Sequence, residues 1–385
     1  MSEGPFKVET MLQHLGEDEH IKGAVVPPIF QNSLFVFESC EEFAQSMQPV
    51  PPKHVYSRVG NPTVDIVNAK VAALEHHEAG MVFGSGMAAI STAIMSCVKT
   101  GAHVLAVDTC YGPTKQFLKD YLPRFGVTAT FVEGVDPQQV IDAIQENTTL
   151  IYLESPSSIV FWMQDYEPIC QEAHRRGIKV AMDSSYSAGI LQNPADFGVD
   201  LVLHSATKYL CGHSDVVAGA LACSREHMDK IIVDELALFG SILHPFPAWL
   251  MLRGLRTLAV RLKQHEQTGN EVANWLLAHP KVGRVNHIGL DCHPQASLVK
   301  KYMRGSGGLL SFELKDCTKE LAWQIVNRYQ LFQRGVSWGG FESLGICTEY
   351  APMNWEAPRW VFRLYCGLED SGDLIRDLEQ ALSIA

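Results

Sequence analysis

Short apolar runs alternate with segments of helical periodicity between residues 60 and 230, and this alternation constrains the fold more than any other feature of the chain. The apolar runs cover 80–83, 103–107, 128–132, 150–153, 179–182, 201–204 and 218–223. The helical segments between them cover 63–77, 86–98, 113–125, 137–146 and 166–176. A strand, helix, strand order requires crossover connections, so the sequence predicts an α/β fold with a large, mostly parallel sheet.

Three parts of the chain differ in pattern. Prolines at 27, 28, 49, 51 and 52 interrupt residues 1–55, which lack a strong amphipathic period, so we expect an arm that packs on a neighbouring subunit. Residues 56–246 carry the alternating pattern and form the expected α/β domain. Residues 247–385 begin with a helical stretch, 247–279, and continue with apolar or helical segments at 308–314, 321–327, 361–364 and 371–384. This last part predicts a second, smaller α+β domain.

Charge and cysteine usage limit the partners. The chain has 385 residues, with 31 Lys and Arg against 43 Asp and Glu, which gives a net charge of −12. Such a surface repels polyanions, so we expect neither nucleic-acid nor anionic-membrane binding. The first twenty residues lack a basic-then-apolar signal, which predicts a cytoplasmic protein. The ten cysteines form no C-x-x-C pair, so they predict reduced thiols and no metal site.

Chemically reactive residues follow two of the predicted strands. Asp183 follows 179–182, and Ser205, Thr207 and Lys208 follow 201–204. In parallel sheets, ligands bind beyond the carboxyl ends of the strands. Pyridoxal phosphate needs an amine for a Schiff base, a carboxylate beside its ring nitrogen and donors for its phosphate. Lys208 alone is typical of a surface lysine, and Asp183 alone of a helix cap, but together they favour this cofactor.

Glycines at 84 and 86 come directly after the first apolar run and open a helix. There, backbone N–H groups and the helix N-terminus can bind a phosphate. The same segment matches G-x-G-x-x-A, and Asp108 lies where a ribose partner is sought, so a nicotinamide-dependent oxidoreductase is a rival interpretation. The rival leaves Asp183 and Lys208 without roles.

Two further side chains suit an amino-acid substrate. Tyr111 follows the run 103–107, where its ring can stack on a cofactor ring, although a half-buried core tyrosine is the alternative. Arg363 ends an apolar run and therefore needs a carboxylate. An amino-acid substrate supplies one, and an internal salt bridge is the alternative.

Several longer motifs resemble those of one enzyme family. They are YSRVGNPT at 56–63, SGMAA at 85–89, SATKYL at 205–210, GHSD at 212–215, RGLRTL at 253–258 and GLED at 367–370. Together they are similar to the cysteine/methionine-metabolism family of pyridoxal-phosphate enzymes, from about residue 20 to the C-terminus. The resemblance implies fold type I, which is aspartate-aminotransferase-like. It also implies an amino-acid substrate and a homotetramer of dimers that share active sites.

The resemblance assigns expected roles by position. Lys208 binds the cofactor and moves protons, Asp183 pairs with the ring nitrogen, and Tyr111 stacks on the ring. The expected phosphate ligands are Gly86, Met87, Ser205 and Thr207, with Tyr56 and Arg58 from the neighbouring subunit. Ser158 is expected near a cofactor oxygen. The expected substrate contacts are Arg363, Ser337, Trp338 and Tyr56.

Within the family, the chain is most similar to the cystathionine β-lyases of proteobacterial type. Ser158 in the segment 154–159, Trp338 in 337–344 and Pro113 carry this similarity. It implies β-elimination from cystathionine-like amino acids, giving pyruvate, ammonia and a thiol. The alternative is γ-elimination or γ-replacement on a homoserine-derived, methionine-like or γ-halogenated amino acid.

Two segments depart from the family pattern. They are Asp183-Ser184-Ser185-Tyr186 and Phe161-Trp162. These residues either reshape the substrate pocket or lie behind it, and the sequence leaves both readings open. An inactive scaffold is a poor alternative, because the expected covalent and phosphate-binding positions are all present.

Overall fold

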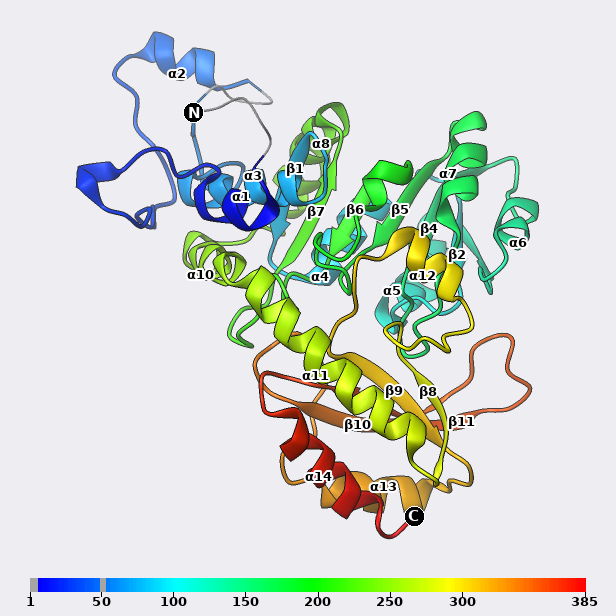
Figure 1. Ribbon diagram of the computed structural model, residues 1–385. Coiled ribbons are helices and arrows are strands. Elements are labelled where there is room, and N and C mark those ends of the chain that lie inside the picture. Colours follow the sequence, from blue (N-terminus) through cyan, green and yellow to red (C-terminus); the bar gives the residue numbers. More distant parts are fainter. Residues whose placement is uncertain (1–5, 49–52) are drawn as a thin grey trace.

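The computed structural model describes residues 6–48 and 53–385, and it contains two β-sheets. The prolines at 49, 51 and 52 of the expected arm lie outside the described residues. One sheet has seven strands and the other has four, with the long helix α11 (Leu258–Ala278) running from one to the other (Figure 1).

The larger sheet is mostly parallel, as predicted. Its strand order is β1 (Ala79–Phe83), β7 (Gly219–Cys223), β6 (Leu201–His204), β5 (Lys179–Asp183), β4 (Thr148–Glu154), β2 (His103–Val107) and β3 (Thr128–Val132). Only β7 runs antiparallel to its neighbours. Every residue of β2, β6 and β7 is buried, so these strands are covered on both faces.

Helices at the predicted places connect these strands. They are α3 (Pro62–Leu74), α4 (Gly86–Met95), α5 (Gly112–Gln116), α6 (Pro137–Asp142), α7 (Tyr166–Arg175) and α8 (Arg225–Ile231). Side-chain caps begin several of them. The Ser85 hydroxyl accepts a hydrogen bond from the Ala88 N–H at 3.0 Å and so starts α4 directly after β1 and Gly84.

The helical stretch predicted at 247–279 is two helices, α10 (Pro245–Arg256) and α11. The break is at Thr257, whose φ of −107° and ψ of 5° are not helical. The Thr257 N–H and hydroxyl both turn back to the Gly254 carbonyl, at 3.2 Å each. The Arg261 guanidinium also donates to that carbonyl, at 2.8 Å. These three hydrogen bonds to the Gly254 carbonyl end α10 at a position where the hydrophobic periodicity of the sequence continues without a break.

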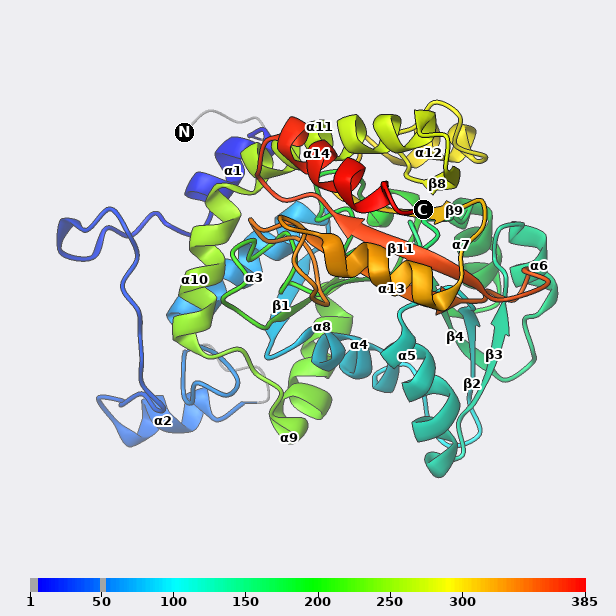
Figure 2. The ribbon, with the colours of Figure 1, turned by 90° about the horizontal axis from the view of Figure 1, so that it is seen from below.

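The smaller sheet is antiparallel, with the order β10 (Leu344–Tyr350), β11 (Arg359–Tyr365), β9 (Leu309–Leu314) and β8 (Val282–Asn286). A second apolar cluster joins it to α11, α13 (Lys319–Arg328) and α14 (Ser371–Leu382), which Figure 2 shows beside β11. β9, β11, α13 and α14 match predicted segments, and β8 and β10 were not predicted.

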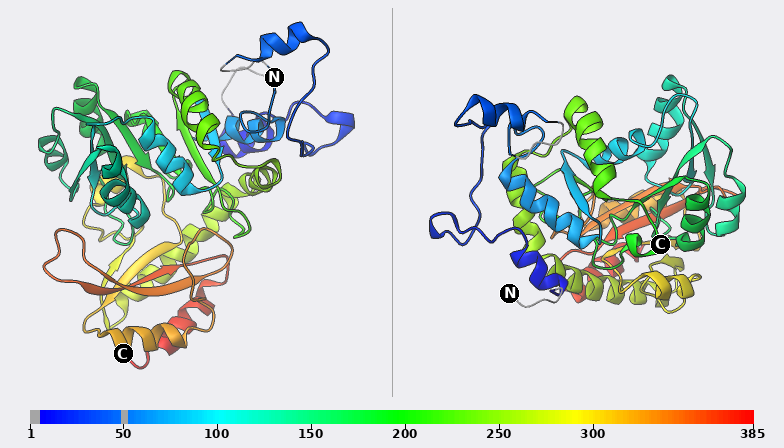
Figure 3. Two further views of the ribbon diagram at one scale, coloured as in Figure 1. Left: turned by 180° about the vertical axis from the view of Figure 1, so that it is seen from behind. Right: turned by 90° about the horizontal axis from the view of Figure 1, so that it is seen from above.

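The N-terminal part extends from the body of the molecule, as Figures 1 and 3 show for the region around α2 (Cys40–Ser46). Its helix α1 (Val8–His14) is held against the body. The fully buried Lys70 amine, on α3, donates to the Leu12 carbonyl at 2.9 Å and pairs with Glu17 at 3.0 Å. Glu17 also pairs with Arg256 on α10. A buried charge network therefore fixes the beginning of the arm.

The loop 351–358, between β10 and β11, returns from the small sheet to the large one. The Met353 N–H donates to Asp108 Oδ2 at 2.9 Å, beyond the end of β2. The Asn354 amide donates to Glu133, which follows β3. The remaining short helices include α9 (Ala237–Phe239) and α12 (Ala296–Tyr302). Among the described residues, every helix is too short or too polar to cross a membrane.

Candidate active site

The carboxyl ends of β1, β2, β4, β5 and β6 meet at one edge of the large sheet, and the predicted site residues follow them. Lys208 lies in the turn after β6, and its amine donates to the Ser337 hydroxyl at 2.6 Å. The amine is 5.6 Å from the centre of the Trp338 ring. The smaller domain thus places Ser337 and Trp338 directly beside the expected cofactor lysine.

The backbone around Ser337 has an unusual conformation. Ser337 has a φ of +80° and Gly339 a φ of +88°, both in the left-handed region. A Cβ on Gly339 would lie 2.7 Å from the Lys208 carbonyl carbon and from the Tyr209 nitrogen. Glycine at 339 is therefore required for this turn to approach Lys208. Strain at a non-glycine residue such as Ser337 is typical of a functional site.

Burial makes the Lys208 amine less basic. Burial lowers its pKa to about 8, and the nearby Arg363 acts in the same direction, while Asp183 opposes them. A larger fraction of this amine is therefore neutral at neutral pH than of an ordinary lysine. A neutral amine can add to a carbonyl group or accept a proton.

Asp183 is the last residue of β5 and is only 7% exposed. Its Oδ1 accepts a hydrogen bond from the Ser185 N–H at 2.9 Å. Burial raises the pKa of Asp183, and the charges of His204 and Lys208 partly oppose this rise. A cationic group bound beside the carboxylate would offset the cost of its burial.

In the turn after β1, the main chain lies close to Ser205, as a phosphate-binding site requires. A Cβ on Gly86 would lie 2.9 Å from the Ser205 hydroxyl oxygen, so only glycine fits beside Ser205. Met87 follows in the first turn of α4. Thr207 lies in the turn after β6, where its hydroxyl and the Ala218 main chain exchange hydrogen bonds of 3.1 and 3.0 Å. Three predicted phosphate ligands, Gly86, Met87 and Ser205, therefore gather at the N-terminus of α4.

Arg363 lies on β11 and reaches the same crevice. Its guanidinium donates to the Ser337 carbonyl at 3.1 Å. Burial lowers its pKa, and the nearby Tyr111 opposes this effect. Within residues 6–48 and 53–385, no carboxylate lies within 4.0 Å of it, so the alternative of an internal salt bridge is wrong. The structure provides Arg363 with a hydrogen-bond acceptor but no countercharge.

Tyr111 and Ser158 are linked by Glu154, a residue that the sequence analysis did not select. Glu154 ends β4, is 7% exposed and accepts hydrogen bonds from the Ser158 hydroxyl at 2.6 Å and the Tyr111 N–H at 2.7 Å. It lies opposite Asp183 in the strand register. The signal available in the sequence was its position at a strand end, the same signal that selected Asp183.

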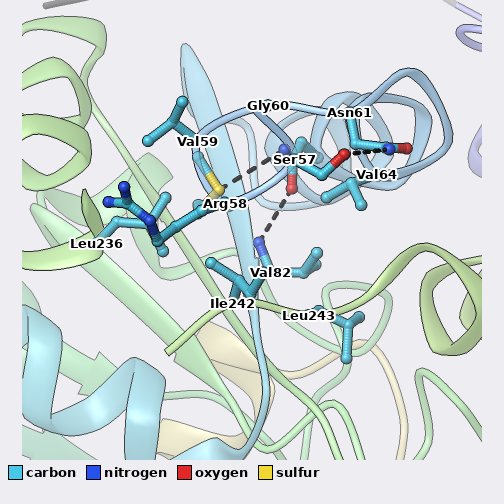
Figure 4. Close-up of a pocket in the computed structure, with 12 residues that line it drawn as sticks. Ser57, Arg58, Val59, Gly60, Asn61, Val64, Val82, Leu236, Ile242 and Leu243 are labelled. Atoms are coloured by element: carbon cyan, nitrogen blue, oxygen red, sulfur yellow. Dashed lines mark hydrogen bonds between the residues drawn. The ribbon is translucent and has the colours of Figure 1, made fainter. Parts of the chain in front are cut away.

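Tyr56 and Arg58 make their contacts elsewhere in the chain. Tyr56 is 44% exposed, and the Arg58 guanidinium lies 5.5 Å from its ring. Arg58 also donates to the Ala237 carbonyl, and Figure 4 shows it reaching toward Leu236 across a small cavity next to β1. Within one chain, the described hydrogen bonds of these two residues do not connect them to Lys208, Asp183 or Arg363.

A family model described as "Cys/Met metabolism PLP-dependent enzyme" matches residues 9–383 of the chain. The chain belongs to this family. It is 38% identical over 381 residues to L-methionine gamma-lyase of Treponema denticola, covering 96% of this chain and 95% of the relative. It is also 38% identical to cystathionine beta-lyase MetC of Bacillus subtilis, covering 99% and 98% of the two chains.

A solved structure agrees with this membership. It is described as an O-acetylhomoserine (thiol)-lyase from Campylobacter jejuni and contains N'-pyridoxyl-lysine-5'-monophosphate. It superposes with a TM-score of 0.91 and 31% identity, covering 98% of this chain and all of the other. The family resemblance, the fold and the dependence on pyridoxal phosphate are therefore confirmed.

The residues present fit this cofactor. A buried carboxylate without an ion-pair partner among the described residues, an amine of lowered pKa and a glycine-lined helix N-terminus lie at one sheet edge. The nicotinamide alternative finds no support. Asp108, its proposed ribose ligand, pairs with Lys115 and accepts the Met353 N–H, so its carboxylate is already bound.

Two of the unusual aromatic residues are buried near Trp338. Phe161 and Tyr186 are buried, with ring centres 5.8 Å apart. Tyr186 is 6.4 Å from Trp338, and Tyr209 is 5.3 Å from it on an edge-to-face approach. The rings of Tyr186 and Tyr209 pack against Trp338, which lies beside the Lys208 amine.

Proposed function

We propose that the protein is a carbon–sulfur lyase that catalyses β-elimination from cystathionine-like amino acids, giving pyruvate, ammonia and a thiol. One observation carries the proposal: Arg363, half-buried and without a countercharge in the described chain, lies beside the Lys208 and Ser337 pair. This arrangement suits a substrate with a carboxylate and an amine on the same carbon.

The cofactor has a defined set of proposed ligands. Lys208 would bind its aldehyde group, Asp183 would pair with its ring nitrogen, and Tyr111 would pack on its ring. Its phosphate would be bound by Gly86, Met87, Ser205 and Thr207, with Tyr56 and Arg58 of a neighbouring subunit, and Ser158 would contact a cofactor oxygen. When bound, pyridoxal phosphate stores the electron pair that the substrate Cα releases on losing its proton.

The chain's own residues perform the remaining tasks. Arg363 binds the substrate carboxylate and thereby orients the Cα–H bond. The Lys208 amine, once it is free and neutral, accepts the Cα proton, and the Ser337 hydroxyl holds this amine in place. Trp338 forms one wall next to the amine and keeps water away from it. Tyr56 of the neighbouring subunit completes the substrate contacts.

A γ-elimination or γ-replacement reaction is the second candidate, favoured by the similarity to L-methionine gamma-lyases. Such a reaction also requires removal of a proton from Cβ, so a base must act a second time. Lys208 and Tyr111 are the two groups of the crevice that can accept this proton. The substrate is then a homoserine-derived, methionine-like or γ-halogenated amino acid.

A substrate panel separates the two candidates. The purified holoenzyme is incubated with cystathionine, cystine, methionine, O-acetylhomoserine and a γ-chloro amino acid, and the keto acids are identified. The β-lyase proposal predicts pyruvate from cystathionine and cystine as the main products. Predominant 2-oxobutyrate contradicts it and supports the γ-reaction.

The proposal includes the organisation of the assembly. Residues 1–55 serve as an arm that contributes to the neighbouring subunit, 56–246 bind the cofactor, and 247–385 form the smaller domain. Four chains assemble as two dimers with shared active sites, and the enzyme works in the cytoplasm. The exposed apolar side chains of the arm, Val25 at 80% and Val36 at 88%, support such an assembly, because burial in a neighbour removes them from water.

A further inference from the structure

Glu154 is a buried carboxylate with no cationic partner. It ends β4 at the same sheet edge as Lys208 and is 7% exposed. Among the described residues, no lysine, arginine or histidine nitrogen lies within 4.0 Å of its oxygens. An isolated buried carboxylate is costly, so such a group persists only when its hydrogen bonds or its protonation offset that cost.

Both oxygens of Glu154 are engaged by groups that flank the cofactor crevice. Oε2 accepts the Tyr111 main-chain N–H, which lies in the loop after β2. Oε1 pairs with the Ser158 hydroxyl in the loop after β4. The Tyr111 residue is 47% exposed, so the hydrogen bond from its main-chain N–H to Glu154 helps to fix the position of a residue with few surrounding contacts. One carboxyl group therefore joins the loops that follow the paired strands β2 and β4.

Asp183 lies directly across from Glu154. The two residues are register partners on β4 and β5, so two buried carboxyl groups stand side by side at the sheet edge. Burial raises the pKa of Glu154, and the charge of Asp183 raises it further. Like charges this close disfavour double ionisation, so one of the two groups retains a proton.

We propose that Glu154 is a positioning residue of the reaction, which acts in its neutral form to fix the Tyr111 main chain and the Ser158 hydroxyl while Asp183 carries the charge. The inference rests on the proposed function, since it takes Tyr111, Ser158 and Asp183 as cofactor contacts. In this proposal, Asp183 neutralises the protonated ring nitrogen of the cofactor. Glu154 holds the loops that contain Tyr111 and Ser158.

The protonation state of Glu154 decides what Ser158 can offer. An ionised Glu154 carboxylate can only accept hydrogen bonds, so the Ser158 hydroxyl must donate its hydrogen to Glu154. A neutral Glu154 still accepts the Tyr111 N–H through Oε2, and it donates its own proton from Oε1 to the Ser158 oxygen. The hydrogen of the Ser158 hydroxyl is then free to point into the crevice. A serine at this position thus becomes a donor toward the cofactor.

The test compares three variants of the holoenzyme. Glu154→Leu removes both contacts, Ser158→Ala removes one, and Glu154→Gln keeps an acceptor for Tyr111 and a donor for Ser158 without a charge. The readouts are the visible absorption and circular-dichroism bands of the bound cofactor, kcat, KM and the thermal unfolding temperature. We expect Glu154→Leu to lower kcat about 10- to 100-fold, with an altered dichroism band and a KM within about threefold of the wild type.

The two other variants control this result. Ser158→Ala is expected to show a smaller loss of kcat and an altered band. Glu154→Gln is expected to restore the wild-type band and kcat to within about threefold, because glutamine mimics the neutral acid. A wild-type band and kcat in Glu154→Leu overturn the proposal, and so does a Glu154→Gln variant as impaired as Glu154→Leu.

Two further outcomes are decisive. If Glu154→Leu does not fold, Ser158→Ala and Glu154→Gln decide, and a wild-type spectrum in Ser158→Ala overturns the inference. Failure of the proposed function has a different signature: the wild-type enzyme then gives predominantly 2-oxobutyrate in the substrate panel, whatever the Glu154 variants do.

Discussion

At the scale of single residues, the strand ends carry the chemistry, and the sequence located most of it. Asp183 and Lys208 could be selected because each follows a recognisable apolar run. Glu154 also follows an apolar run and was missed, because its partners, the Tyr111 N–H and the Ser158 hydroxyl, become apparent only in the folded chain. The Ser337 contact with Lys208 joins residues 129 positions apart, and only the family resemblance pointed to it.

Arg363→Ala tests the carboxylate contact. The variant is expected to raise KM or lower kcat/KM by about 10- to 150-fold, which corresponds to about 1.5–3 kcal/mol for charged hydrogen bonds. Cofactor content, measured from the visible absorption, is expected to remain within about twofold. Arg363→Lys retains the positive charge but cannot form two parallel hydrogen bonds to a carboxylate. Its kcat/KM should therefore lie between those of the wild type and Arg363→Ala. An unchanged KM in Arg363→Ala places the carboxylate contact elsewhere.

The lowered pKa of Lys208 predicts how the cofactor-free protein captures pyridoxal phosphate. The neutral amine is the form that adds to an aldehyde, so the capture rate should rise about tenfold per pH unit below pH 8 and level off above it. Stopped-flow absorbance at a series of pH values measures the rate, with Lys208→Arg as a control that should not react. A midpoint near the ordinary lysine value of 10.5 would mean that burial does not affect this amine.

At the scale of elements, the hydrophobic periodicity of the sequence predicted the buried strands and most helices. It did not predict helix ends that depend on local polar contacts. The Thr257 break between α10 and α11 depends on a carbonyl shared with Arg261, which periodicity does not encode. Strands β8 and β10 are edge strands of the small sheet with partly exposed patterns, so neither has the continuous apolar run of β2 or β7.

Gly339→Ala tests whether the turn beside Lys208 requires glycine. An added Cβ meets the Lys208 and Tyr209 main chain, so we expect loss of the ordered Lys208 contact and a destabilisation of about 2–4 kcal/mol, measured by chemical unfolding. Gly177→Ala is the matched control. Gly177 has a φ of +71° but open space around its Cβ position, so it reports backbone strain alone, about 1 kcal/mol. Equal effects in the two variants would refute the close approach.

At the scale of the whole molecule, the crevice is made where the two sheets meet. The large sheet supplies Lys208 and Asp183, and the small sheet supplies Arg363 and the segment at Ser337. The sequence predicted both parts but could not show how closely they approach. The contacts of Ser337 with Lys208, and of the loop 351–358 with Asp108, are tertiary features without a local pattern.

Shared active sites predict complementation between two impaired variants. Lys208→Ala lacks the cofactor amine, and Arg58→Ala lacks the phosphate contact that we assign to the neighbour. In a mixed dimer, one of the two sites has both native residues, so the purified mixed dimer should have about half of the wild-type activity. Differently tagged chains are co-expressed, and the mixed species is purified before assay. Activity no higher than that of the separate variants would mean that each site is built within one chain.

The central claim is that the Lys208 amine holds pyridoxal phosphate beside Asp183. The most direct measurement is borohydride reduction of the purified yellow enzyme, followed by digestion and mass spectrometry of the lysine-containing peptides. We expect a stable pyridoxyl-phosphate label on Lys208 at about one per chain, and loss of the label in Lys208→Ala. A label on a different lysine, or a fully active enzyme with no label at Lys208, would contradict it.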